Sequence, residues 1–365
     1  MRILILANSL SGLFRFREEL LMELLRNHAV YISSPNDGDV KKCESLGCVF
    51  LETAINRRGK NPFNDLKLLK KYKTIIKCIK PNVVLTFTIK PNIYGGLACQ
   101  KFKIPYIVNV TGLGTAIENG GFLQKIILYL YKKSLRKAAN VFFQNSSNLE
   151  FMRFKGVVIN NYRLIPGSGV NLEKHQYKKY PADTNQITFV TLGRIMKDKG
   201  INELLEAAEI IKTDYPNVRF QLLGSFDEDF KEKDKLNRLK GVVECLGVVS
   251  NVDDYLAKSY ATIHPSYHEG MSNVLLETAA CGRPILASDV PGCRETFVDG
   301  MTGISFKPKN VNSLVSAIKE FINLPYEKKV QMGIEGRKKI ESEFDRRIVV
   351  SAYIDSINMF SKGES

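Results

Sequence analysis

Residues 264–284 read HPSYHEGMSNVLLETAACGRP, and they follow an apolar segment, 261–263, that is typical of a buried strand. The polar turn after this strand contains Gly270, which can adopt backbone conformations closed to other residues. Ser272 or Asn273 is a suitable N-cap for a helix that ends before the glycine and proline at the close of the stretch. The stretch therefore predicts a strand, a loop and a helix.

Two acids stand out in this unit. Glu269 lies in the polar turn, and Glu277 interrupts an apolar run in the predicted helix. Helical side chains tilt toward the N-terminus, so both carboxylates can converge on one ligand at the start of the helix. Free N–H groups and the positive end of the helix dipole suit a phosphate there. The alternative is an ordinary turn acid and a surface helix acid with no shared role.

The alternation of strands and helices runs through the whole chain. In the first half, the expected strands lie at residues 2–7, 30–32, 49–51, 83–87, 106–110, 141–143 and 164–165. In the second half, they lie at 187–192, 220–223, 242–246, 262–263, 284–287 and 304–306. Continuous apolar strands separated by helical patterns indicate parallel sheets that are covered on both faces. We therefore predict an α/β protein with a Rossmann-like domain in each half.

The length and composition agree with this organisation. A chain of 365 residues suits two domains, and its 44% hydrophobic and 25% charged content is that of a soluble globular protein. We place the linker in the polar stretch 171–185, which gives an N-terminal domain of 1–175 and a C-terminal domain of 176–345.

The positive charge is concentrated in the first half of the chain. The net charge is +15, and residues 1–180 hold 29 Lys and Arg against 11 Asp and Glu. A basic half indicates an anionic partner, which leaves nucleic acid, anionic lipid and a phosphorylated substrate open. The predicted helix 122–138 is amphipathic and basic, which suits an anionic membrane, although a core helix with a solvated face is the more common reason for such a pattern.

Cysteine usage and the first residues bear on the compartment. The seven cysteines form no CxxC pair, so neither a zinc site nor a disulfide framework is indicated. The opening MRILILANSL is too short for a signal-peptide core, and no stretch is long and apolar enough for a spanning helix. We expect a cytoplasmic protein. His264 and His268 are poor metal ligands because they lack helical register, so no metal is expected.

A second loop carries two cations. Gly193-Arg194 and Lys199-Gly200 bracket a predicted strand-to-helix turn. Cations fixed beside a helix N-terminus can stabilise a diphosphate leaving group as its negative charge develops. Cations in such turns are also commonly just solvated. The pairs Gly112–Gly114 and Gly167–Gly169 do not complete the dinucleotide-binding pattern, so a dinucleotide site is only weakly supported.

Taken together, the frame from Pro265 to Pro284 with Glu269 and Glu277, and the Gly193-Arg194-x4-Lys199-Gly200 loop, resemble the family 4 retaining glycosyltransferases. The first half, with its segment 88–95, is similar to members that build bacterial O-antigen, capsule or lipid-linked oligosaccharides. The resemblance implies the GT-B fold, which has two Rossmann-like, doubly wound parallel-sheet domains facing across a cleft. It also implies that a last helix, within 346–365, crosses back onto the first domain.

The resemblance implies roles for matching residues. Glu269, Arg194 and Lys199 would act in catalysis, with the two cations on the donor diphosphate, and Glu277 would bind the ribose. The other donor-binding residues that it implies are Gly12, Gly193, Val248, Gly270, Met271, Ser272 and Asn273. Many members place a histidine near the sugar after a first-domain strand, but 108–112 has none. The acceptor-side candidates are Lys90, Asn92, Asn109, Thr111 and Glu118.

The expected activity is retaining transfer of a sugar, with GalNAc, Gal or GlcNAc as candidates, from a UDP-sugar to a polyprenyl-diphosphate-linked saccharide. A carboxylate near the reacting carbon and cations at the diphosphate serve both developing charges, so neither a metal nor another cofactor is expected. The site would work at the inner face of the plasma membrane, with the basic domain on anionic lipid. A nucleotide-sugar epimerase is the alternative enzyme. No nucleic-acid partner is expected, because no reading motif is present.

Overall fold

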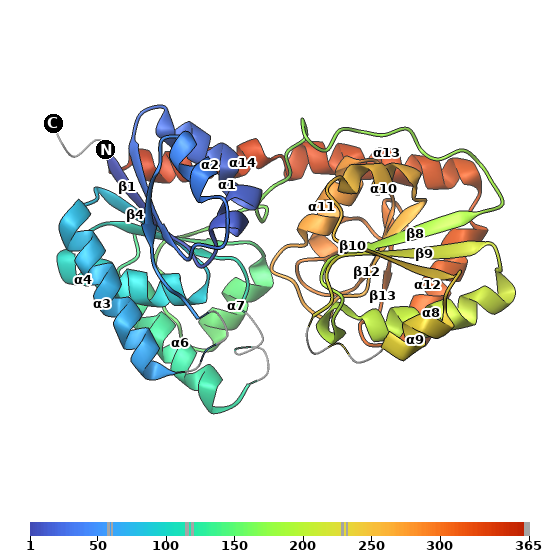
Figure 1. Ribbon diagram of the computed structural model, residues 1–365, viewed down its shortest axis with the longest axis horizontal. Coiled ribbons are helices and arrows are strands. Elements are labelled where there is room, and N and C mark those ends of the chain that lie inside the picture. Colours follow the sequence, from blue (N-terminus) through green and yellow to red (C-terminus); the bar gives the residue numbers. More distant parts are fainter. Residues whose placement is uncertain are drawn as a thin grey trace. The chain divides into compact units, whose positions relative to one another are not determined.

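The computed structural model describes residues 1–56, 59, 61–113, 117, 120–227, 230 and 233–360 (Figure 1). The chain forms two compact units. Unit 1 contains residues 1–168 and 346–365, and unit 2 contains residues 169–345.

Unit 1 is built on a parallel sheet of seven strands in the order β3-β2-β1-β4-β5-β6-β7. The strands are β1 (Arg2–Leu6), β2 (Ala29–Ser34), β3 (Val49–Glu52), β4 (Val83–Phe87), β5 (Tyr106–Val110), β6 (Asn140–Phe143) and β7 (Tyr162–Leu164). The central strands are buried along almost their whole length, because helices cover both faces of the sheet. The strand order reverses direction between β1 and β4, which is the switch point where open α/β sheets bind ligands.

The helices of unit 1 divide between the two faces of the sheet. They are α1 (Leu10–Leu25), α2 (Val40–Ser45), α3 (Pro62–Ile79), α4 (Gly96–Phe102), α6 (Gly121–Leu135), α7 (Ser146–Phe154) and α14 (Arg346–Asn358), and a π-helical turn spans Pro91–Gly95. Helices α1, α2 and α14 pack with alternate residues of β1 and β4 in one core. Helices α3, α4, α6 and α7 pack against the other set in a second core.

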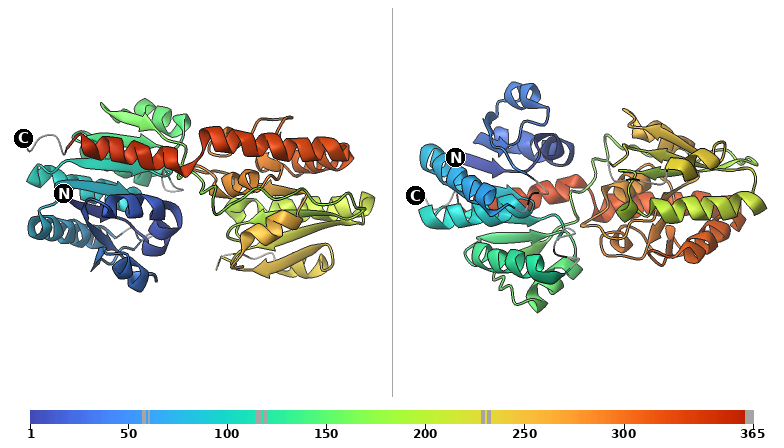
Figure 2. Two further views of the ribbon diagram at one scale, coloured as in Figure 1. Left: turned by 90° about the horizontal axis from the view of Figure 1, so that it is seen from above. Right: turned by 60° about the horizontal axis from the view of Figure 1, so that its bottom comes forward.

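The returning helix α14 is anchored to unit 1 by specific contacts. The ring of Tyr353 lies edge-on to Phe142, with 4.7 Å between centroids, and Arg346 donates two hydrogen bonds of 2.9 Å to the carboxylate of Glu19. Figure 2 shows α14, in red, lying along this unit. The contacts explain why a segment more than 300 positions away from α1 belongs to the same core.

Unit 2 contains a parallel sheet of six strands in the order β10-β9-β8-β11-β12-β13. The strands are β8 (Ile187–Leu192), β9 (Val218–Leu223), β10 (Val243–Gly247), β11 (Ala261–His264), β12 (Ile285–Ser288) and β13 (Gly303–Phe306). The helices are α8 (Ile201–Asp214), α9 (Lys233–Arg238), α10 (Val252–Lys258), α11 (Asn273–Ala280), α12 (Val311–Asn323) and α13 (Tyr326–Glu343). The predicted class, two parallel α/β sheets, is confirmed.

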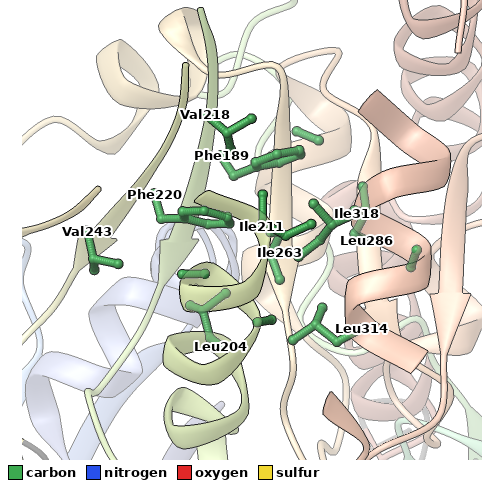
Figure 3. Close-up of a cluster of buried hydrophobic side chains, with 14 of the residues drawn as sticks. Phe189, Leu204, Ile211, Val218, Phe220, Val243, Ile263, Leu286, Leu314 and Ile318 are labelled. Carbon is green, nitrogen blue, oxygen red and sulfur yellow. The ribbon is translucent and has the colours of Figure 1, made fainter. Parts of the chain in front are cut away.

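The main core of unit 2 lies between the sheet and helices α8 and α12. Figure 3 shows Phe189 of β8 and Phe220 of β9 side by side, with Leu204 and Ile211 of α8 below them; the two rings stack at a centroid distance of 5.6 Å. Helices α11 and α13 pack with β12 in another core. The sheet is thus covered on both faces, which makes its strand ends and the loops after them the accessible edge.

The segment before β8 belongs to unit 2, so the change of unit falls at 168–169 and earlier than the expected boundary at 175. Arg283 is completely buried and explains this attachment. Its guanidinium donates to the carbonyls of Lys178 and Lys179 and to those of Leu256 and Ala257 in α10. A polar segment thereby becomes a fixed part of the domain.

In the part of the chain that the structure describes, no helix combines the length and apolar character needed to cross a bilayer.

Candidate active site

The stretch 264–284 folds as predicted. Strand β11 ends at His264, a loop follows, and α11 runs over Asn273–Ala280. Ser272 is the N-cap, but its side chain does not cap the helix, because its hydroxyl lies against the ring of His264 instead. The first amides of α11 are therefore left without a side-chain cap, at the end of the helix that carries its positive dipole.

Glu269 is held in this loop by a cluster of polar side chains. Its carboxylate accepts a hydrogen bond from Nζ of Lys199, and its Oε1 lies 2.9 Å from Nε2 of His264. Oγ of Ser272 lies 3.2 Å from the same ring nitrogen. Only 16% of the Glu269 side chain and 3% of the His264 side chain are exposed. The carboxylate is therefore oriented in a largely dry environment.

The surroundings of Glu269 keep it ionised. Burial by itself would raise its pKa, but the hydrogen bond with His264 and the positive charge of Lys199 outweigh burial and hold the pKa well below its usual range. A buried anion with two polar partners can stay charged beside a developing cation, as a glycosyl transition state requires.

Lys199 reaches Glu269 because two loops pack against each other. Lys199 ends a 3₁₀ turn after β8, and the amide of Tyr267 donates to the carbonyl of Asp198 at 3.0 Å. Gly200 follows with φ +67°, and a Cβ at that position would lie 2.1 Å from the carbonyl oxygen of Pro265. Glycine is thus required there both by the backbone conformation and by the close approach.

Glu277 lies in the second turn of α11 and is 8% exposed. Its carboxylate forms no hydrogen bond or ion pair with the residues that the structure describes. The side-chain Oδ1 of Asn273, at the start of the same helix, is fully buried and has no partner among the described atoms. A buried polar atom without a partner in the protein is uncommon, and a ligand that binds there is one explanation for it.

Other donor-side candidates are placed differently. Arg194 forms an ion pair with Asp227, with Nη1 3.3 Å from Oδ2, and its side chain is 55% exposed. Val248 follows β10 and is 79% exposed. Gly193, with φ +130°, lets the chain turn beside Gly224. Gly270 and Met271 lie in the loop between Glu269 and α11, and the Met271 side chain packs in the core beneath that helix.

In unit 1, a carboxylate is bound at the start of α1, the helix whose first turn contains Gly12. The carboxylate of Asp37, which follows β2, accepts hydrogen bonds from the amides of Leu10 and Ser11, at 2.9 and 3.2 Å, and from the hydroxyl of Ser9 at 2.6 Å. The amide of Gly12 donates to Ser9 Oγ at 3.0 Å. The start of α1, where the resemblance implies that Gly12 binds the donor, therefore already holds a carboxylate.

Among the acceptor-side candidates, Lys90 lies at a polar surface. Its Nζ is 2.7 Å from Oδ1 of Asp65 and donates to the carbonyl of Gly59 at 2.9 Å. The hydroxyl of Tyr94 donates to the other oxygen of Asp65. Burial and this carboxylate raise the pKa of Tyr94. Lys90 is thus paired with an acid of α3 that the sequence did not single out.

Asn92 and Asn109 do not fit an acceptor role, because both are at most 1% exposed. The amide of Asn92 bonds to the carbonyl of Asn109 at 2.8 Å and accepts from Thr86, so it holds the π-helical turn against β5. Asn109 Nδ2 donates to the hydroxyl of Tyr353 in α14. They are structural residues of unit 1. Thr111 is half-buried just after β5, and Glu118 lies outside the described residues.

Sequence reasoning missed four partners: His264, Asp37, Asp65 and Asp227. His264 was considered only as a metal ligand, although a histidine at the end of a strand, five positions before Glu269, is a signal for an acid–histidine pair. Asp37 follows β2 directly, and parallel strands β1 and β2 end at the same edge, which could have suggested its contact with the loop after β1. Nothing in the sequence pattern indicated Asp227.

One group in the described part of the chain has ligand atoms close enough to share a metal ion. It consists of His175, Asp253 and Cys281, whose ligand atoms lie within 4.8 Å of one another. His175 Nδ1 is 2.8 Å from Asp253 Oδ1. Cys281 is the C-cap of α11, at the opposite end of that helix from the Glu269 loop. The expectation that transfer needs no metal stays a prediction.

Two family models match the chain, one in each unit. The model described as glycosyl transferases group 1 matches residues 173–339, which include both carboxylates and the Lys199 loop. The model described as glycosyl transferase 4-like matches residues 2–145. The chain belongs to the family 4 glycosyltransferases.

Curated relatives of this glycosyltransferase are similar along most of their length. It is 28% identical, over 97% of both chains, to N,N'-diacetylbacillosaminyl-diphospho-undecaprenol alpha-1,3-N-acetylgalactosaminyltransferase of Campylobacter jejuni. It is 27% identical, over 82% of both chains, to the capsular polysaccharide biosynthesis glycosyltransferase CapM of Staphylococcus aureus.

Solved structures show the same fold. The glycosyltransferase superposes on sucrose-phosphate synthase from Thermosynechococcus elongatus with a TM-score of 0.82, 20% identity and full coverage of both chains. It superposes on HepE of Anabaena, solved in complex with UDP and glucose, with a TM-score of 0.80 and 18% identity, over 98% of this chain and 100% of the other. The GT-B fold is thereby confirmed.

Proposed function

We propose that this glycosyltransferase transfers a sugar from a UDP-sugar to a polyprenyl-diphosphate-linked saccharide, with retention at the anomeric carbon, in the assembly of a bacterial surface polysaccharide or glycan. The candidate sugars are GalNAc, Gal and GlcNAc. The observation that carries the proposal is the buried Glu269 carboxylate held by Lys199 and His264 beside the uncapped start of α11. The printed name of the Campylobacter jejuni relative supports GalNAc and a lipid-diphosphate acceptor.

The donor diphosphate is assigned to the cationic side of this cluster. Lys199 Nζ and the first amides of α11 are hydrogen-bond donors that favour a negatively charged ligand. Arg194, whose exposed side chain pairs with Asp227 at 3.3 Å, has the freedom to exchange that carboxylate for a phosphate. Glu277, which is 8% exposed and whose carboxylate has no partner among the described residues, provides an acceptor for the two ribose hydroxyls.

The transfer step breaks one bond and forms one. The bond between the anomeric carbon and the β-phosphate oxygen breaks, and UDP leaves with the electron pair. The acceptor hydroxyl oxygen attacks the same face of the sugar and forms the new carbon–oxygen bond, and its proton passes to the departing phosphate oxygen. Glu269 stabilises the positive charge on the sugar, and Lys199 stabilises the negative charge on UDP. Apart from Glu269, no described side chain of this cluster has both the position and the negative charge that a nucleophile would need.

The exposed side chains of helix α6 support the proposal that the enzyme acts at a membrane surface. Phe122 and Tyr129 are 79% and 58% exposed, and Ile126 is 40% exposed. Lys125 and Lys133 lie on the same helix. Exposed aromatic and aliphatic side chains beside lysines can insert into the headgroup region of an anionic bilayer. We therefore propose a cytoplasmic enzyme, peripheral at the inner face of the plasma membrane.

Release of UDP tests the reaction. Purified enzyme is given each UDP-sugar with and without a polyprenyl-diphosphate-linked saccharide, and UDP and the glycan product are measured. We expect UDP and an extended glycan only when both substrates are present, and an unchanged anomeric configuration by NMR. Conversion of the UDP-sugar into its epimer without an acceptor would favour the epimerase instead. Inversion in the product would contradict the retaining mechanism, and loss of activity in a metal chelator would contradict metal independence.

A further inference from the structure

Unit 1 has a cavity that the donor-side cluster does not use. Its volume is about 800 Å³, which lies in the range of small-molecule sites. It opens where β2 and β3 end, and helix α3, labelled in Figure 1, forms one of its walls. Among its lining residues are Asn36, Asn56, Asn64, Lys67, Lys71 and Lys90. The cavity lies at the carboxyl ends of strands, the edge at which α/β domains bind ligands, and one strand to the side of the switch point between β1 and β4.

The polar groups of the cavity suit a saccharide. Asn36 and Asn64 are exposed, and their side-chain amides form no hydrogen bond with a described residue. Each amide offers both donors and an acceptor, which is the combination that sugar hydroxyls and acetamido groups match. Glu52, also exposed on the lining, adds a further acceptor. The positive charge of Lys90, whose side chain is 15% exposed, is already balanced, since it pairs with Asp65 at 2.7 Å.

The two remaining lysines of the lining suit a diphosphate. Lys67 and Lys71 are four positions apart on α3, so their side chains lie on the same helix face. Both are exposed, and neither forms an ion pair with a residue in the described part of the chain. Two adjacent ammonium groups at the mouth of a polar cavity provide charge-assisted hydrogen bonds to a dianionic group.

The same helix begins with exposed apolar side chains. Phe63 is 73% exposed and Leu66 is 55% exposed, in the first turns of α3. The order along the helix is therefore apolar residues, then the lysine pair, with the amide-lined cavity beside the lysines, while Phe63 and Leu66 lie outside its lining. A polyprenyl-diphosphate-linked saccharide has the same order of chemical parts, which are a lipid, a diphosphate and a sugar.

We infer that this cavity is the acceptor subsite. It binds the saccharide among Asn36 and Asn64, the diphosphate at Lys67 and Lys71, and the first isoprene units at Phe63 and Leu66. This inference rests on the proposed function and adds to it the residues of unit 1 that recognise the acceptor. None of them is among the acceptor-side residues that the family resemblance indicated.

The experiment compares two double variants with matched controls. Lys67→Ala/Lys71→Ala removes the proposed diphosphate contacts, and Lys77→Ala/Lys101→Ala removes the same charge from exposed positions outside the cavity. Initial rates are measured in solution without vesicles, with a short-chain diphosphate saccharide as acceptor, so that membrane binding does not contribute. We expect the cavity variant to raise the KM for the acceptor about tenfold or more. The KM for the UDP-sugar stays within twofold in both variants.

The second pair tests the lipid part. Phe63→Ser/Leu66→Ser should raise the KM for a long-chain acceptor in detergent micelles but not for the short-chain acceptor, and Met22→Ser, at another exposed apolar position of unit 1, should change neither. Thermal unfolding of each variant checks that it is folded. A wild-type enzyme that extends no lipid-linked saccharide overturns the proposed function and this subsite together. Wild-type transfer combined with an unchanged acceptor KM in Lys67→Ala/Lys71→Ala overturns the subsite alone.

Discussion

Lys199 and Glu269, which are 70 positions apart in the chain, form an ion pair between the loop after β8 and the loop after β11. The pair exists because Gly200 allows its loop to reach Pro265 at a distance that a side chain would block. A cation and an anion are thus fixed at the carboxyl ends of adjacent strands. Under the proposed mechanism, they are the two charges that the transition state requires.

Replacement of Lys199 by alanine should reduce kcat about 100-fold or more, because the departing diphosphate loses a fixed cation. The measurement is UDP release at saturating donor and acceptor. Lys197→Ala is the matched control, since Lys197 is an exposed lysine in the same 3₁₀ turn. Equal rates in both variants would remove Lys199 from the mechanism.

The Glu277→Gln variant separates the contribution of Glu277 to donor binding from its contribution to the stability of the fold. Glu277 is 8% exposed and its carboxylate has no partner among the described residues, yet its oxygens keep some contact with solvent, so its replacement should leave the free energy of unfolding nearly unchanged. The KM for the UDP-sugar should rise about tenfold or more if the carboxylate accepts the ribose hydroxyls. Urea unfolding and donor titration measure the two effects. A destabilised variant with a normal donor KM would show that Glu277 serves the fold.

The depressed pKa of Glu269 predicts a pH dependence of stability. A carboxylate whose pKa is lower in the folded than in the unfolded state adds stability above its ordinary value, about 4.3, and loses that stability as the pH falls. The stability difference between the wild type and Glu269→Gln should therefore shrink as the pH falls from about 6 to about 3. Thermal unfolding across this range measures the difference. A constant difference would show that the carboxylate is not stabilised in its charged form.

Arg283→Ala should strongly destabilise unit 2. The guanidinium satisfies carbonyls of the segment before β8 and of α10, and its loss leaves several of them buried without a donor. We expect the free energy of unfolding to fall by about 3 kcal/mol or more. Arg238→Ala, at an exposed position of α9, should change it by less than about 0.5 kcal/mol. Denaturant unfolding compares the two, and similar values would refute the anchoring role of Arg283.

The exposed apolar residues of α6 predict membrane binding. Phe122→Ser/Ile126→Ser should weaken binding to vesicles that contain anionic lipid about tenfold or more, through loss of inserted apolar area. Vesicle sedimentation measures the change, and Ile210→Ser in unit 2 is the control. Binding that persists in the α6 variant, or wild-type binding that is equal for neutral and anionic vesicles, would contradict the proposed surface.

The local pattern of the sequence was sufficient for the elements around the site. Apolar runs gave the strands, and the change of period from 261–263 to 273–280 located β11 and α11 within a few residues. The prediction succeeds because strands buried on both faces are continuously apolar, whereas the apolar residues of a helix recur about every 3.6 positions. The boundary between the units was less predictable, because the polar segment 171–185 is attached by the buried side chain of Arg283 and not by an apolar pattern.

The sequence by itself determined the two parallel α/β sheets, and it placed the acids and cations in loops that follow strands. Only the tertiary structure decided their partners: Glu269 with Lys199 and His264, and Asp37 at the start of α1. It also buried Asn92 and Asn109 in the core. The physical reason is that hydrophobic periodicity reports which face of an element is covered. Partner choice depends instead on strand order and loop packing, which bring together residues that no local pattern connects.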